Sequence, residues 1–268
     1  MSKFEKEQVF SMPSILISGF GIVGRHIKKE FPFASTYDKD VDMGADFVNI
    51  PQSKFDFCFI CVPTPNITDN NKCDISYVEE VLNEIKADIY IIKSTIPPKT
   101  TEMLNKKYNK NIIFSPEFYS VTNYGSNDDF VILGGEDDKC VHKVRQLYEI
   151  NKSSDFKIYQ CKSIEAEIIK YMANCFLATK VIFCNQFKDI ADLYEVDYSK
   201  IRDGLILDKR IGESHTFVFD DYRGYDSKCL NKDIPAFITA IKEKGFKNKF
   251  LLETVDEINN LYKGKIKK

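Results

Sequence analysis

Three closely spaced glycines near the start of the chain form a GxGxxG pattern, which is typical of a turn that holds a phosphate. Gly19, Gly21 and Gly24 directly follow an apolar, strand-like run and open a helix-like segment. In this setting the first glycine makes a tight turn, the second lets a pyrophosphate approach the backbone, and the third lets the helix pack on the strand. The start of the helix, at Ile22 and Val23, favours the negative charge of such a ligand.

A carboxylate follows this turn at a position from which it could select between NAD and NADP. Asp38 follows Gly19 by 19 residues and ends the next apolar segment. A carboxylate at this point hydrogen-bonds the ribose hydroxyls of NAD and would repel the 2′-phosphate of NADP. The sequence therefore predicts NAD as the cofactor, against the alternative of a tight turn without a ligand.

The cysteines and histidines lack the spacing of a metal site or a disulfide framework. Cys58 and Cys61 have CxxC spacing, but they lie in one apolar run. A separation of three puts their side chains on opposite faces of a strand, so we expect buried core cysteines. His26, just after the glycine turn, is expected on the surface of the first helix.

Short apolar runs alternate with helix-like segments over the first 160 residues, which predicts a mostly parallel sheet covered by helices. The expected strands are Ser14–Ser18, Ala34–Tyr37, Phe55–Val62, Ile89–Ser94, Ile112–Phe114, Phe130–Leu133 and Phe156–Tyr159. We therefore predict an α/β fold, with a Rossmann-type parallel sheet domain over residues 1–161 and an all-helical domain over residues 162–268.

The helical domain is expected to form around one long helix. From Ser163 to Tyr194 there is no Pro or Gly, and apolar residues recur at helical spacing. This predicts a helix of roughly 45 Å that begins with Ser163 as its N-cap. Further helices are expected over Tyr198–Leu207, Ile234–Lys244 and Lys249–Tyr262, with a loop between Asp208 and Asp233.

The composition excludes several classes of partner. The 268 residues include 38 Lys and Arg against 40 Asp and Glu, a net charge of −2, so nothing biases the chain toward nucleic acid or an anionic membrane. No apolar run reaches the ~18 residues that span a bilayer. The segment Met1–Gln8 is charged and does not resemble a signal peptide, so a cytoplasmic location is expected.

Six further motifs follow one another along the chain. They are Cys61-Val62-Pro63-Thr64-Pro65, Lys93-Ser94-Thr95-Ile96-Pro97, Ser115-Pro116-Glu117-Phe118, Ala166-Glu167 with Lys170 and Asn174, Asp208-Lys209-Arg210-Ile211-Gly212, and Cys229-Leu230-Asn231-Lys232-Asp233. In this order and spacing the chain resembles the UDP-glucose/GDP-mannose dehydrogenase family, from about Pro13 to Tyr262. That family oxidises C6 of a nucleotide sugar from alcohol to acid with two NAD per turnover.

The resemblance implies a role for each matched residue. Cys229 matches the catalytic cysteine, which holds the aldehyde as a thiohemiacetal, loses hydride to give a thioester and is freed by water. Lys170 matches a lysine that raises the thiolate fraction of this cysteine. Because Lys170 and Asn174 are four residues apart on one helix, both can donate hydrogen bonds to the oxygen at C6.

Hydrolysis and binding residues are implied in the same way. Thr95 and Asp233 match residues that hold the catalytic water, and Glu117 matches the acid and base of thioester hydrolysis. The implied contacts to NAD are Gly19, Gly21, Ile22, Val23, Gly24, Asp38, Val62, Pro63, Thr64 and Thr95. Those to the sugar nucleotide are Glu117, Phe118, Lys170, Asn174, Gly224 and Arg210, the last reaching the neighbouring subunit's substrate in a homodimer.

The sequence departs from the family pattern at several positions. Asp226 and Ser227 replace glycines before the cysteine, Val121 replaces a second glutamate, and Asn231 replaces a proline. The resemblance also ends before the family's C-terminal domain, which closes over the nucleotide. We expect that a separate chain completes the site, that the substrate is smaller or held differently, or that activity is lost.

Two other functions remain open at this stage. One is a hydroxyacid-type dehydrogenase, which makes a single hydride transfer and also uses a helix lysine with an asparagine four residues on. The other is an NAD-binding protein with an assembly or regulatory role and no turnover, which the altered glycine loop before Cys229 would suit.

Overall fold

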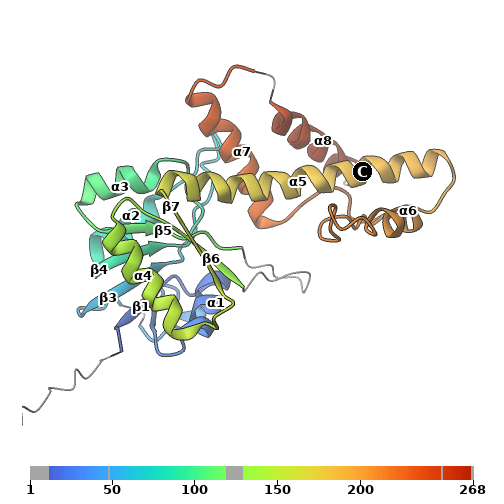
Figure 1. Cartoon of the computed structure of the whole chain (residues 1–268). Helices are drawn as coiled ribbons and strands as arrows, with labels where there is room; N and C mark the ends of the chain where they lie inside the picture. The colour runs from blue at the N-terminus through green and yellow to red at the C-terminus, as the bar shows by residue number, and fades with distance from the viewer. Residues whose placement is uncertain (1–11, 48, 119–128, 249, 267–268) are drawn as a thin grey trace, which may run out of the picture.

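The structure, a computed structural model, describes residues 12–47, 49–118, 129–248 and 250–266. A seven-stranded sheet forms the first part of the chain and helices form the second (Figure 1), as the predicted fold class requires. The strands are β1 (Ile15–Ser18), β2 (Ser35–Tyr37), β3 (Lys54–Ile60), β4 (Lys86–Ile92), β5 (Ile112–Phe114), β6 (Phe130–Gly134) and β7 (Lys157–Cys161).

The sheet has the strand order β2-β1-β3-β4-β5-β6-β7, and all neighbouring strands are parallel except β5 and β6. The elements that connect the strands are α1 (Ile22–Glu30), the 3-10 turn η1 (Val41–Met43), α2 (Ser76–Glu84), α3 (Thr100–Tyr108) and α4 (Asp138–Asn151). Helices α1 and α4 cover one face, while α2, α3 and the start of α5 cover the other. Burial on both faces explains why the strands are continuously apolar.

The second part of the chain is built on α5 (Ser163–Leu193), which begins at the sheet and extends well beyond it (Figure 1). Helices α6 (Tyr198–Leu205), α7 (Lys228–Glu243) and α8 (Leu251–Ile266) contact α5 along its length. Apolar side chains of α5, α7 and α8 form their own core, which includes Ala178, Ile182, Ile234 and Val255. The first turns of α5 meet α7 and the segments that follow β4 and β5 at one junction.

Two helix starts differ from the sequence-based expectation. Helix α7 begins at Lys228 rather than Ile234, because the Ser227 hydroxyl accepts a hydrogen bond from the backbone N–H of Leu230 (3.2 Å) and caps the helix. Helix α5 has Lys162 rather than Ser163 as its N-cap residue. The Ser163 hydroxyl is buried and donates to Glu136 instead (2.8 Å).

Two expectations concern residues that the structure does not describe. Met1–Gln8 and Val121 lie outside the described residues. In the ranges that are described, no helix has the length and apolar character needed to cross a membrane. The expected core position of Cys58 is confirmed, and Cys61 is half-buried and packs on the opposite face of the sheet.

Candidate functional site

The glycine turn between β1 and α1 is too tight for any other residue at two of its positions. Gly19 has a φ of +92°, and a Cβ there would lie 2.7 Å from the carbonyl carbon and oxygen of Cys61. A Cβ on Gly24 would lie 2.0 Å from the carbonyl oxygen of Gly19. A Cβ on Gly21 would meet no atom within 4 Å, so this glycine borders open space.

The surroundings of the turn fit a dinucleotide. Across the described residues, no side chain caps the start of α1, so its first N–H groups are left for a ligand. Asp38 lies at the end of β2, and its carboxylate accepts a hydrogen bond from the backbone N–H of Phe20 (2.6 Å). The predicted acidic residue is therefore held beside the glycine turn, with open space in front of Gly21.

A loop after β3 joins the sheet to α7. The Thr64 hydroxyl donates to the carbonyl oxygen of Thr95 (2.8 Å) and accepts from the Lys232 ammonium (3.2 Å). The Asn66 amide donates to the carbonyl oxygen of Lys232 (2.7 Å). The predicted cofactor residues Thr64 and Thr95 are thus brought next to the helix that carries Cys229.

Two polar side chains of α5 reach different segments of the chain. Lys170 Nζ donates to the carbonyl oxygen of Glu117 (2.5 Å), just after β5. Asn174 Nδ2 donates to Asp233 Oδ2 on α7 (2.6 Å). Since Asp233 is four residues after Cys229, both occupy the same side of α7.

The Lys170 ammonium is the electrostatic centre of this group. Burial lowers its pKa, and the nearby Asp233, Cys229 and Glu117 oppose that effect. Five of the residues that the sequence singled out, namely Cys229, Lys170, Asn174, Asp233 and Thr95, thus lie at the junction of the sheet with α5 and α7.

Cys229 is placed where a nucleophile can be reached. It is exposed, and it lies in the first turn of α7, where the helix dipole favours negative charge. Asp233 is buried, at 1% exposure, and its Oδ1 lies 2.7 Å from the Lys232 ammonium. In the described part of the chain no donor is aligned for a hydrogen bond to this oxygen.

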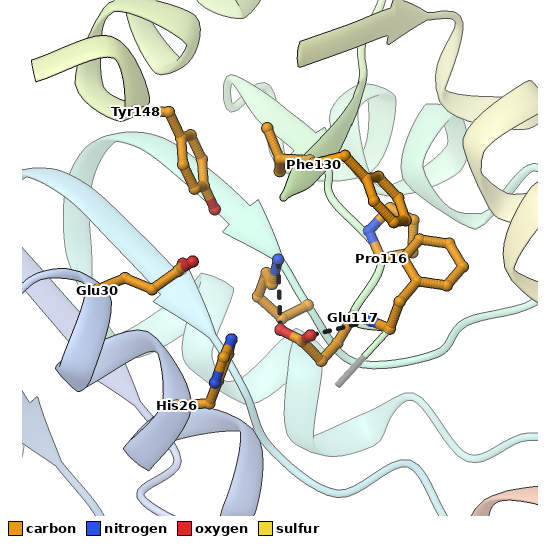
Figure 2. Close-up of a pocket in the computed structure, with 9 residues that line it drawn as sticks. His26, Glu30, Pro116, Glu117, Phe130 and Tyr148 are labelled. Carbon is orange, nitrogen blue, oxygen red and sulfur yellow. Dashed lines mark hydrogen bonds and ion pairs between the residues drawn. The ribbon is translucent and has the colours of Figure 1, made fainter. Parts of the chain in front are cut away.

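Glu117 differs from the expectation because its backbone and its side chain face different sites. Its carbonyl accepts from Lys170, whereas its carboxylate lies 3.6 Å from the Lys93 ammonium and accepts from the backbone N–H of Phe118 (2.9 Å). The carboxylate lines a small cavity of about 20 Å³. Figure 2 shows that His26, Glu30 and Tyr148 also border this cavity. That volume suits about one water molecule.

Lys93, in the Lys93-Ser94-Thr95-Ile96-Pro97 motif, has no role predicted from the sequence, yet the residue is buried, at 5% exposure. Burial alone would lower its pKa, but Tyr148, Glu117 and Glu30 outweigh burial and raise it. The Lys93 ammonium also donates a hydrogen bond to the Ser115 hydroxyl (3.3 Å). A lysine at the end of an apolar strand is the only sequence signal of this buried position.

The loop before Cys229 is bonded to α5 and α8. Gly224 has a φ of +74°, and a Cβ there would lie 2.4 Å from Asn259 Oδ1. Asn259 Oδ1 also accepts from the backbone N–H of Tyr225 (2.7 Å). Asp226 and Asn231 both depart from the family pattern, and the Asn231 amide donates a hydrogen bond to the Asp226 carboxylate (2.6 Å). Asp226 also forms an ion pair with Lys263 (2.6 Å). The loop is therefore ordered without the missing glycines.

Arg210 lies away from the group around Lys170, whereas Phe118 borders it. The Arg210 guanidinium is 89% exposed and hydrogen-bonds Asp208, in the loop that follows α6. In the described structure no contact joins it to Cys229. The Lys170 ammonium lies 5.2 Å from the centre of the Phe118 ring, so Phe118 borders the site.

Comparison with known proteins places both halves of the chain in one family. Residues 37–152 match the NAD binding domain of the UDP-glucose/GDP-mannose dehydrogenase family, and residues 164–261 match its central domain. UDP-glucose 6-dehydrogenase of Pseudomonas aeruginosa is 31% identical over 72% of this chain and 46% of its own length. UDP-N-acetyl-D-mannosamine dehydrogenase of Methanocaldococcus jannaschii is 29% identical over 92% of this chain and 61% of its own length.

Solved structures share the fold. A UDP-glucose dehydrogenase from Pyrobaculum islandicum superposes with a TM-score of 0.79 at 23% identity, over 95% of this chain and 69% of that one. Mycobacterium tuberculosis 3-hydroxyisobutyrate dehydrogenase superposes at 0.69 and 15% identity, over 95% of this chain and 94% of that one. The chain spans about half the length of the UDP-glucose 6-dehydrogenases it matches.

Proposed function

Because the chain belongs to the UDP-glucose/GDP-mannose dehydrogenase family, we propose that it oxidises the C6 alcohol of a nucleotide sugar to the acid, with Cys229 as nucleophile. The observation that carries the proposal is the convergence of Lys170 with Cys229 and Asp233 at the junction of the sheet and α7. We also propose that residues 1–161 form an NAD-binding domain and that residues 162–268 form a helical domain.

NAD is the cofactor of this family, and when bound it accepts the hydrides that C6 loses. The glycine turn and the free N–H groups of α1 would hold its pyrophosphate, and Asp38 its ribose. Val62, Pro63, Thr64 and Thr95 follow β3 and β4 and would border the rest of the cofactor. Together these residues form the proposed NAD site.

The cysteine chemistry is proposed in three steps. After the alcohol has become an aldehyde, the Cys229 sulfur adds to C6, so that a C–S bond forms and the oxygen takes up a proton. Loss of a second hydride and the hydroxyl proton gives a thioester. Water then adds to C6, the C–S bond breaks, and the thiol and the carboxylic acid are released.

The surrounding residues are assigned to these steps by their chemistry. The Lys170 ammonium and the Asn174 amide would donate hydrogen bonds to the oxygen at C6. Asp233 and Thr95 would hold the attacking water. Glu117 would take a proton from that water, which requires its carboxylate to leave the Lys93 side.

The assembly is proposed to be a homodimer that pairs through α5. Large apolar side chains on its outer side remain exposed in the single chain, among them Met172 at 70% and Phe176 at 65%. In such a dimer Arg210 would reach the partner's substrate. Because the matched relatives are longer, a separate chain could complete the nucleotide site. The eight free thiols favour a cytoplasmic setting.

The decisive experiment is a panel of UDP-glucose, UDP-N-acetylmannosamine and GDP-mannose with NAD, followed by NADH absorbance. The proposal predicts turnover with one of them and its loss by about 10³-fold or more in Cys229→Ala. Cys161→Ala, on β7, is the matched control and should keep full activity. No NADH from any sugar at high enzyme concentration would count against the proposal.

A single-step dehydrogenase of the hydroxyacid type is the second candidate. The likeness in fold to 3-hydroxyisobutyrate dehydrogenase, over nearly the full length of both chains, favours keeping it. In that case Cys229→Ala would leave turnover of a small hydroxyacid unchanged, and no nucleotide sugar would be oxidised.

A further inference from the structure

A buried carboxylate on α5, which has no part in the proposed chemistry, binds the loop that carries Thr95. Glu167 is fully buried and lies one turn before Lys170. Its Oε1 accepts hydrogen bonds from the backbone N–H (2.8 Å) and hydroxyl (2.6 Å) of Thr101, and its Oε2 accepts from the backbone N–H of Lys99 (2.5 Å). Three donors thus satisfy one buried charge.

These donors stand at the start of α3, where the local sequence supplies no cap. Lys99, the residue before α3, has a φ of +76°, and in the described structure its side chain makes no cap hydrogen bond. Negative charge is stabilising at a helix N-terminus, so Glu167 acts as the missing cap from another helix. Glu167 thus holds the end of the segment between β4 and α3, residues 93–99, and this segment includes Thr95.

The spacing on α5 relates this contact to the site. Glu167, Lys170 and Asn174 are at positions i, i+3 and i+7, so they share one side of the helix. Each binds a different segment: the β4–α3 loop, the residues after β5, and α7. One helical stripe therefore sets the spacing between the three segments that carry Thr95, Glu117 and Cys229.

We propose that Glu167 is a positioning residue, which fixes Thr95 relative to Lys170 and Asn174 and so places the water that hydrolyses the Cys229 thioester. Its effect on hydrolysis rests on the proposed function, whereas its hold on the β4–α3 loop does not. Burial raises the pKa of Glu167, while the hydrogen bonds from Thr101 and Lys99 oppose that shift.

The test compares Glu167→Gln with the wild type. The glutamine keeps the shape but directs an N–H₂ group at N–H donors, so we expect amide exchange at Lys99 and Thr101 to quicken by about tenfold or more. With substrate, the oxidation steps should persist while hydrolysis slows. The thioester on Cys229 should then accumulate in intact-mass spectra, and kcat should fall more than KM rises. Glu167→Asp, which keeps the charge, should restore part of the activity.

Glu165→Gln is the matched control, because Glu165 is an exposed neighbour on the same helix and binds only the local Lys162 N–H among the described contacts. It should change neither readout. Unchanged exchange at Lys99 and Thr101 in Glu167→Gln would overturn the proposal, as would equal losses of oxidation and hydrolysis without an adduct. If Glu167→Gln does not fold, Thr101→Val removes one donor and gives the same test.

The two readouts separate this proposal from the proposed function. If the wild type forms no NADH with any nucleotide sugar, the proposed function fails. Amide exchange then still decides whether Glu167 holds the loop: faster exchange supports the hold, and unchanged exchange rejects it.

Discussion

Helix α5 has two faces that both depart from those of an ordinary surface helix, because polar side chains are buried among the apolar ones on one face and large apolar side chains are exposed on the other. The face toward the rest of the chain buries polar side chains, with Glu167 at 0%, Asn174 at 7% and Asn185 at 1% exposure. The outer face exposes large apolar side chains, with Phe176 at 65% and Phe183 at 52%. The inner face bonds to other segments of the chain, whereas the outer face has apolar area that the single chain does not cover.

The two faces serve different purposes. Glu167 and Asn174 each bond a segment distant in sequence; Asp233, for example, is 59 residues from Asn174. Such contacts cost desolvation and are kept where they fix a geometry. Changes on the inner face should therefore alter chemistry, and changes on the outer face should alter assembly.

Among changes on α5, the largest expected effect follows from Asn174→Leu on the inner face. The variant loses the donor that binds Asp233 and that we assign to the oxygen at C6, so kcat should fall by about 10²–10³-fold. Steady-state NADH formation with the preferred sugar measures it. Gln186→Leu makes the same change at an exposed position of α5 and should keep activity. Equal activity of Asn174→Leu and Gln186→Leu would break the comparison.

A pH profile tests the charge that the inner face holds. The ammonium form of Lys170 is the active one in our account, and burial lowers its pKa from 10.5. Activity should therefore be lost as the pH rises through a value below 10.5. In Lys170→Arg, whose charge persists to high pH, this alkaline loss should disappear while kcat falls by roughly tenfold. A profile with the same alkaline loss in both proteins would exclude Lys170 as its origin.

The outer face should respond in the opposite way. Introducing charge with Phe176→Glu and Phe183→Glu should convert a dimer into a monomer, halving the mass measured by light scattering, because each buried carboxylate would be unpaired. NAD binding by calorimetry should not change. Ile150→Glu, at an exposed apolar site on α4, should leave the mass as it is. A wild-type chain that is already a monomer would contradict the proposed dimer.

The smallest expected effect joins the two faces. If Arg210 reaches the partner's substrate, Arg210→Ala should raise KM for the sugar by about tenfold, the loss of one charge-assisted contact. Lys209→Ala is the control. In the Phe176→Glu, Phe183→Glu background, Arg210→Ala should have no further effect on KM. An undiminished effect there would place Arg210 in its own subunit's site.

Much of the fold could be predicted because its signals are local. Continuous apolar runs predicted the parallel strands, and the spacing of Gly19, Gly21 and Gly24 predicted the turn that the structure has. The 31-residue helix α5 could be predicted from its period and from the absence of Pro and Gly. The start of α7 could not be predicted, because the composition of residues 228–233 is similar to that of the loop before them. The hydrogen bond by which Ser227 caps the helix is seen only in the structure.

The site was harder to predict, since its contacts join distant segments. Helical spacing placed Lys170 and Asn174 on one face but could not say which segments they bind. A sequence also does not distinguish the backbone of Glu117 from its side chain as the partner of Lys170. Burial of Lys93 and Glu167 depends on how the helices pack, so neither could be assigned from residue type.

The number of NADH formed per molecule of sugar consumed decides whether oxidation passes through a thioester on Cys229. Oxidation through a Cys229 thioester predicts two NADH for each sugar acid, with the cysteine carrying the sugar during turnover. One NADH for each product, or an unmodified Cys229 during steady turnover, would contradict the account.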